Sequence, residues 1–148
     1  MKAELTPSAL ATADKRLGRA VFNTACAACH TLYGHGGQVG PDLTGSGRDN
    51  LDYLLDNIVD PGAVVNADFR MSMVDLKDGR TLNGLVAGKT ARTLTLKTQT
   101  ENLALDRGGI ENIRDSSLSL MPEGLLESLT GKQVRDLVAY LMNPTQVP

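Results

Sequence analysis

The sequence of 148 residues predicts a mainly α domain that carries a small inserted antiparallel β unit. Apolar residues recur at helical spacing near both ends and in the middle of the chain, at residues 7–25, 50–59 and 130–143. Over residues 69–115, apolar and polar residues alternate instead, which is typical of β-strands. We therefore expect one domain that spans residues 1–148, with residues 69–115 as a β-rich insertion.

The first helical segment is expected to run without a break into the cysteine at position 26. Thr6 can cap its start with a hydroxyl oxygen, and Pro7 suits the first helical position because it has no N–H to satisfy. Apolar residues then follow at helical spacing: Leu10, Ala13, Leu17, Ala20 and Val21.

The two later helical segments have clear boundaries. The segment 50–59 places its apolar residues at positions i, i+3, i+4, i+7 and i+8, and Asp60-Pro61 should end it. The last segment begins with a capping box formed by Thr130 and Gln133 and should end before Pro144.

The alternating segment 69–115 predicts four or five short antiparallel strands. Asp78-Gly79 indicates a hairpin with a type I′ turn, in which both central residues adopt positive φ. The alternation also gives the unit an apolar face of its own, with these candidates: Val74, Leu76, Leu94, Leu96, Leu103 and Leu105.

Both cysteines and both histidines of the chain lie between Cys26 and His35. The run Cys26-Ala-Ala-Cys29-His30 has the C-x-x-C-H spacing at which c-type haem is attached. In such a site both thiols form thioether bonds to the haem, and the adjacent histidine binds the iron. His35 follows in a glycine-rich loop and is expected to face solvent.

Three other interpretations of the cysteine pair remain open. A redox-active C-x-x-C would follow a strand, whereas a helical pattern precedes Cys26. A zinc site would need Cys26, Cys29, His30 and His35 to converge, without the usual finger spacing. A disulfide between Cys26 and Cys29 would be strained.

The flanking segments resemble class I cytochromes c over residues 7–68 and 117–143. The run GRAVF at 18–22 is similar to the first helix of that family, and LVAY at 137–140 to its last helix. The resemblance implies that the N- and C-terminal helices cross, with another helix in the middle of the chain. It also implies an electron-transfer protein with one covalent haem c and no enzymatic activity of its own.

The resemblance extends to the residues around the iron. The run GPDL at 40–43 is similar to the loop whose proline carbonyl orients the proximal histidine, which implies this role for Pro41 toward His30. Met121-Pro122 resembles the stretch that supplies the second axial ligand. Met121 is therefore the preferred ligand, before Met71 and Met73, and the β unit is expected to supply none.

The chain also resembles haem-binding domains in large multidomain proteins of planctomycete-type bacteria, often found beside sugar-dehydrogenase-like domains. The similarity includes GPDLTGSG, a KDGR hairpin and LMPEGLLESLT. It implies a domain excised from such a protein, with a dehydrogenase as electron donor. Because thioether attachment takes place outside the cytoplasm in bacteria, we expect a periplasmic or other extracytoplasmic setting, although the first residues lack a signal-peptide pattern.

Composition narrows the remaining function classes. The formal net charge of −2 and the absence of a basic block give no indication of nucleic-acid binding, and no apolar run is long enough to span a membrane. The leading expectation is thus a one-electron carrier. The alternatives are a docking module in which the haem is structural and, if Met121 does not bind the iron, an open-site haem enzyme or gas sensor.

Overall fold

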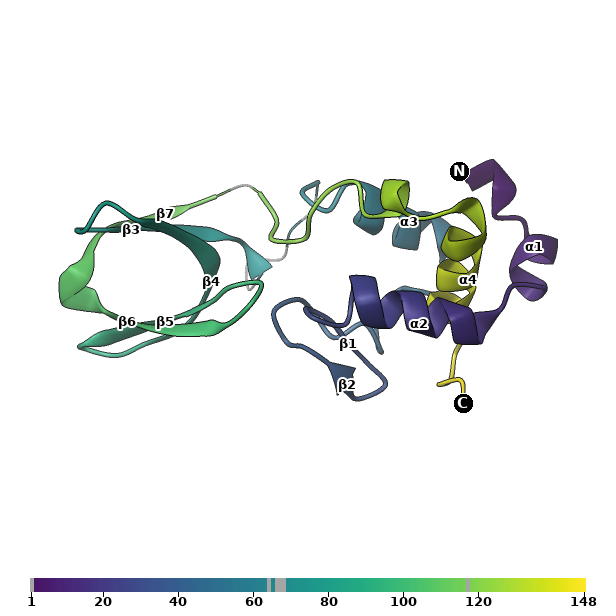
Figure 1. The fold of residues 1–148 in the computed structure, drawn as a ribbon, viewed down its shortest axis with the longest axis horizontal. Helices are drawn as coiled ribbons and strands as arrows, with labels where there is room; N and C mark the ends of the chain where they lie inside the picture. The colour runs from purple at the N-terminus through teal and green to yellow at the C-terminus, as the bar shows by residue number, and fades with distance from the viewer. Residues whose placement is uncertain (1, 64, 66–68, 117) are drawn as a thin grey trace. The chain divides into compact units, whose positions relative to one another are not determined.

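The computed structural model describes residues 2–63, 65, 69–116 and 118–148. The segments 7–68 and 117–143, which resemble class I cytochromes c, therefore include a few residues outside the described ranges: 64, 66–68 and 117. The chain forms two compact units, one made of Met1–Asp60 with Glu123–Pro148 and the other of Pro61–Pro122 (Figure 1). None of the helices among the described residues is long and apolar enough to cross a membrane.

The first unit begins with a short 3-10 turn, Lys2–Glu4, followed by the helices α1 (Pro7–Ala11) and α2 (Lys15–Ala25). Thr6 caps α1 as predicted, but the prediction of one continuous helix is wrong. The carboxylate of Asp14 accepts hydrogen bonds from the N–H groups of Arg16 and Leu17 and so starts a second helix. An aspartate in this role stabilises an extended backbone before the helix, which separates α1 from α2.

The other two helices of this unit, α3 (Leu51–Val59) and α4 (Gly131–Met142), confirm the predicted boundaries. Asn50 caps α3, and both hydrogen bonds of the Thr130–Gln133 capping box are present at α4. A 3-10 turn, Leu126–Ser128, precedes α4.

Helices α2 and α4 pack closely against each other because Gly18 has no side chain. A Cβ atom at this position would lie 1.9 Å from the carbonyl oxygen of Asp136, which α4 contributes. One turn further along α2, the ring of Phe22 packs against Tyr140 with 5.8 Å between ring centroids. These rings belong to the core of the unit, with Leu32, Leu54, Leu55, Leu126, Leu137, Val138 and Leu141.

The second unit is a five-stranded antiparallel sheet with the order β6-β5-β4-β3-β7. Its strands are β3 (Ser72–Leu76), β4 (Thr81–Lys89), β5 (Thr93–Lys97), β6 (Asn102–Asp106) and β7 (Ile110–Asp115), with a 3-10 turn at Arg107–Gly109. The sheet curls, so that β5 and β6 face β3 and β7 (Figure 1). The chain enters and leaves this sheet on neighbouring strands, because Ser72 at the start of β3 pairs with Asp115 at the end of β7, and the Ser116 N–H donates to the Met71 carbonyl at 2.8 Å.

The curled sheet encloses a core of its own. Val74, Leu94 and Leu96 are fully buried in it and Leu76 nearly so, which confirms four of the predicted apolar positions. Leu105 packs against this cluster, whereas Leu103 is half-buried outside it. The unit therefore has the apolar cluster that several strands need to be stable together.

The first hairpin of this sheet differs from the predicted type I′ turn. Gly79 has φ of 94°, but no other residue of this turn adopts positive φ. Hydrogen bonds from Gly79 N–H to the Leu76 carbonyl and from Leu76 N–H to the Arg80 carbonyl close a three-residue loop. Such loops combine a type I turn with one left-handed residue, so the sequence Asp-Gly indicated the turn but not its type.

The prediction of a mainly α fold of the class I cytochrome c type is wrong for this chain. Helices account for 33% of it and strands for 24%, and five strands form a single sheet. The reason is that the alternating segment closes around its own core and is not a minor addition to a helical domain. The chain is an α+β protein.

Candidate functional site

The two cysteines and His30 lie on one turn of backbone that extends α2. The N–H of Cys26 donates to the Phe22 carbonyl at 2.8 Å, and the N–H of His30 donates to the Cys26 carbonyl at 2.9 Å. These bonds hold Cys26, Cys29 and His30 on a single turn, and all three residues are half-buried. Two thiols and one imidazole are thereby presented together at the end of a packed helix.

Both thiols are free and protonated at neutral pH. Burial, with a smaller effect of the neighbouring Cys29, raises the pKa of the Cys26 thiol to about 11. Burial also raises the pKa of the Cys29 thiol. A redox-active C-x-x-C motif depends on a lowered thiol pKa, so these directions count against that interpretation.

The residues of the zinc alternative are not gathered into one site. Among the residues that the structure describes, no three histidine, cysteine, aspartate or glutamate side chains form a set of metal ligands. His35 is exposed on the short strand β2 (His35–Gly36), which pairs with β1 (Thr31–Leu32).

The imidazole of His30 is oriented by the backbone of the following loop. Its Nδ1 lies 2.8 Å from the carbonyl oxygen of Pro41. Because a carbonyl oxygen only accepts hydrogen bonds, we assign the proton to Nδ1, which leaves a lone pair on Nε2. A neutral imidazole with one nitrogen fixed in this way is suited to bind a metal through the other.

The loop returns to the cysteine turn through further backbone hydrogen bonds. The N–H of Gly37 donates to the Ala27 carbonyl and the N–H of Gly40 to the Cys29 carbonyl, both at 2.7 Å. Gly40 also lies against the imidazole, since a Cβ atom there would be 2.6 Å from Cε1 of His30. Glycine at this position therefore allows the loop to reach the ring.

A buried arginine ties this loop to the end of α4. Arg48 is 7% exposed, and it donates hydrogen bonds to the carbonyl oxygens of Thr44, Leu141 and Asn143. Its guanidinium also lies 4.9 Å from the ring centroid of Tyr33, whose hydroxyl donates to the Asn143 carbonyl. The sequence around Arg48, which follows Gly45 and Gly47, did not predict its contacts with α4. The contact of Tyr33 with Asn143 was not predicted either.

Met121 belongs to the second unit and is half-buried there. Its N–H donates to Oγ of Ser119 at 3.1 Å, and the carbonyl oxygen of Leu120 accepts from Nε2 of Gln99 at 2.7 Å. Of the other methionines, Met71 is 8% exposed beside β3 and Met142 packs against the core of the helical unit.

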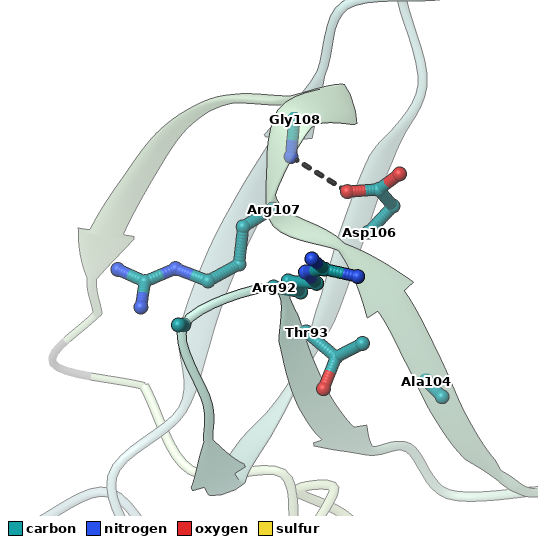
Figure 2. Close-up of a pocket in the computed structure, with 7 residues that line it drawn as sticks. Arg92, Thr93, Ala104, Asp106, Arg107 and Gly108 are labelled. Atoms are coloured by element: carbon teal, nitrogen blue, oxygen red, sulfur yellow. Dashed lines mark hydrogen bonds between the residues drawn. The ribbon is translucent and has the colours of Figure 1, made fainter.

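The structure also contains an open hollow of about 530 Å³ at one end of the sheet, near Arg92 and Arg107. Figure 2 shows that Asp106 accepts a hydrogen bond from the Gly108 N–H, at 2.9 Å, and that the two guanidinium groups lie apart. The Arg107 guanidinium donates to the Thr90 carbonyl at 2.8 Å. These exposed side chains do not converge on a common point, so the hollow is a weaker candidate than the cysteine turn.

Comparison with known families agrees with the geometry of the cysteine turn. The cytochrome c family model matches residues 16–144, most of the chain, so the protein belongs to the cytochrome c family. No curated protein matches the chain. Membership in this family establishes a haem-binding, electron-transfer cytochrome with covalently attached haem c.

The residues of the cysteine turn fit this cofactor. Cys26 and Cys29 provide two free thiols on one turn, as thioether attachment requires. The lone pair on Nε2 of His30 is free to bind iron, and the Pro41 carbonyl holds the ring from its other side. No side chain at Gly40 competes for the space around the imidazole.

Proposed function

We propose that the protein is a monohaem cytochrome that carries one electron at a time, with His30 and Met121 as the axial ligands of the iron. The observation that carries the proposal is the hydrogen bond of 2.8 Å between Nδ1 of His30 and the Pro41 carbonyl. His30 itself lies on the same turn of backbone as both cysteines. A bound haem supplies an iron atom that alternates between ferrous and ferric states.

Different residues of the chain would attach the haem, bind its iron and orient the ligand. Cys26 and Cys29 attach it covalently, so that it stays in place in both oxidation states. His30 donates the Nε2 lone pair, while the Pro41 carbonyl fixes the ring and increases the electron density on the imidazole. A rigid ligand set favours electron transfer because little has to move when the charge changes.

The assignment of Met121 is supported by the family match, which runs through this residue. A thioether is a soft, neutral ligand that stabilises ferrous iron and raises the reduction potential. If Met121 did not bind, an iron position would be open, and an enzyme or gas sensor would become the better proposal.

The redox partner, by the same proposal, is a dehydrogenase domain in the periplasm or another extracytoplasmic compartment. Support comes from the family, whose members are typically extracytoplasmic, and from the resemblance to domains of multidomain bacterial proteins. The chain's charge of −2, with two haem propionates, gives about −4 in the ferrous form. Electrostatic steering by so small a charge is weak, so recognition would rely on short-range contacts.

The absorption spectrum of the oxidised protein tests this proposal. The wild type should show the weak far-red band of methionine bound to ferric haem, and Met121→Ala should abolish it. Met71→Ala and Met73→Ala serve as controls and should keep the band. Loss of the band in either control instead would overturn the assignment of Met121.

A further inference from the structure

We propose that Gln99, in the turn between β5 and β6, is a positioning residue that holds Met121 in the geometry needed to bind iron. This inference rests on the proposed role of Met121. Nε2 of Gln99 donates to the carbonyl oxygen of Leu120 at 2.7 Å, across 21 residues of sequence. Both residues lie within the second compact unit, Pro61–Pro122.

The contact fixes one particular peptide group. The Leu120 carbonyl and the Met121 N–H belong to the same peptide plane, and each has a side-chain partner. Gln99 binds the oxygen, and Oγ of Ser119 accepts from the N–H at 3.1 Å. Because a peptide group is planar, holding both polar atoms limits rotation on either side of it, including φ of Met121.

Pro122 limits the other backbone dihedral of Met121. The ring of a proline clashes with a helical conformation of the residue before it and restricts that residue to extended values of ψ. Both dihedrals of Met121 are thus constrained, φ by the bound peptide group and ψ by Pro122. The direction in which the methionine side chain leaves the backbone follows from these two angles.

The turn that carries Gln99 is itself well ordered by hydrogen bonds. Thr98 N–H donates to the Glu101 carbonyl at 2.9 Å, and Oγ1 of Thr98 accepts from the N–H groups of Thr100 and Glu101. Gln99 therefore projects from a closed turn at the end of two paired strands. The curl of the sheet brings this turn to the segment that follows β7 (Figure 1).

Imidazole binding to the ferric protein measures how firmly Met121 is held. Imidazole binds only where the methionine has left the iron, so its apparent dissociation constant varies inversely with the detached fraction. Loss of one hydrogen bond in Gln99→Leu should enlarge that fraction and tighten imidazole binding about three- to tenfold. Gln99→Glu, which keeps the shape but has no N–H to donate, should behave in the same way.

Glu101→Ala is the matched control, because its side chain shares the turn and makes no hydrogen bond with another described residue. It should leave imidazole affinity within twofold of wild type, and Ser119→Ala should tighten binding as Gln99→Leu does. A merely structural role of Gln99 would lower the melting temperature but leave imidazole affinity unchanged, and this result would overturn the inference. If Met121→Ala keeps the far-red band, the axial assignment itself fails, and the role of Gln99 fails with it.

Discussion

The two residues proposed to bind iron are held by their surroundings in different ways. His30 lies on a turn that continues a packed helix, and its ring and loop are fixed by Pro41, Gly40 and the buried Arg48. The peptide group of Met121 is held by two side-chain hydrogen bonds at half-buried or exposed positions of the second unit, Pro61–Pro122. Under the proposed assignment, the helical unit supplies the covalent attachment, and the second unit holds the ligand that is more easily displaced.

Removal of most of the β unit should have the largest effect, and it tests whether the helical unit alone attaches the haem. Residues 72–115 can be replaced by a short Gly/Ser linker, because Met71 and Ser116 are joined by a hydrogen bond. Covalent haem should remain, since both cysteines, His30 and Pro41 lie in the helical unit. The affinity for imidazole should rise at least as much as it does in Gln99→Leu, because the deletion removes Gln99. Intact mass and an imidazole titration check both results, and loss of the haem would contradict the division.

Arg48→Met should cause the next largest effect, because it removes a charged donor from the buried Leu141 carbonyl and from the part-buried Asn143 carbonyl. Leu141 and Asn143 would lose a charged partner at the end of α4, which costs about 2–4 kcal/mol of unfolding free energy. Denaturant unfolding, followed by helical circular dichroism, measures this loss. Arg16→Met is the control, since Arg16 is exposed on α2, and it should change stability by less than about 0.5 kcal/mol. An equal loss of unfolding free energy in both variants would show that Arg48 does not stabilise the end of α4.

Gly40→Ala tests how closely the loop must approach His30. The new Cβ atom would fall 2.6 Å from Cε1 of His30, so the ring or the loop has to shift, at a cost of about 1–3 kcal/mol. Gly45→Ala is a matched control in the same loop, because a Cβ atom there meets no neighbour within 4 Å. The reduction potential of Gly40→Ala should change while that of Gly45→Ala stays the same. Equal potentials in the two variants would show that the Pro41 contact does not tune the iron.

The smallest expected effect is a pH-dependent one in the β unit. Hydrogen bonds from Arg114, and then from Thr81, lower the pKa of the Asp75 carboxyl. A lowered folded-state pKa adds stability above the unfolded value of about 3.9, and this stability is lost as pH falls through the folded value. Asp75→Asn should therefore melt lower than wild type at pH 7, and the difference should disappear in strong acid.

Glu111→Gln on β7 is the control for this titration, because Glu111 forms no ion pair with a described residue. Its melting temperature should follow that of wild type across the same pH range. A difference for Asp75→Asn that persists unchanged into acid would show that packing, and not the charge of Asp75, is responsible.

The sequence predicted the features that depend on local chemistry. The capping box at Thr130, the ends of α3 and most of the apolar face of the sheet follow from spacing and side-chain type. The break at Asp14 was missed because the apolar spacing continues through a residue that caps a new helix. The fold class was missed because alternation indicates strands but does not show how far they curl around a core.

Contacts between distant segments could not be predicted at the site. Arg48 meets α4 across more than ninety residues, and Gln99 reaches Leu120 only because the sheet curls. Neither residue belongs to a motif, and each acts through backbone carbonyl groups that every sequence contains. The cysteines and His30, by contrast, are identified by a spacing that the attachment chemistry itself imposes.

Intact mass under denaturing and reducing conditions tests the central claim most directly. If the helical unit attaches one haem through Cys26 and Cys29, the measured mass exceeds that of the chain by one haem. The chromophore then stays with the protein after acid–acetone extraction, because thioether bonds survive this treatment. A mass equal to that of the bare chain, with the colour passing into the solvent, would contradict covalent attachment at the cysteine turn.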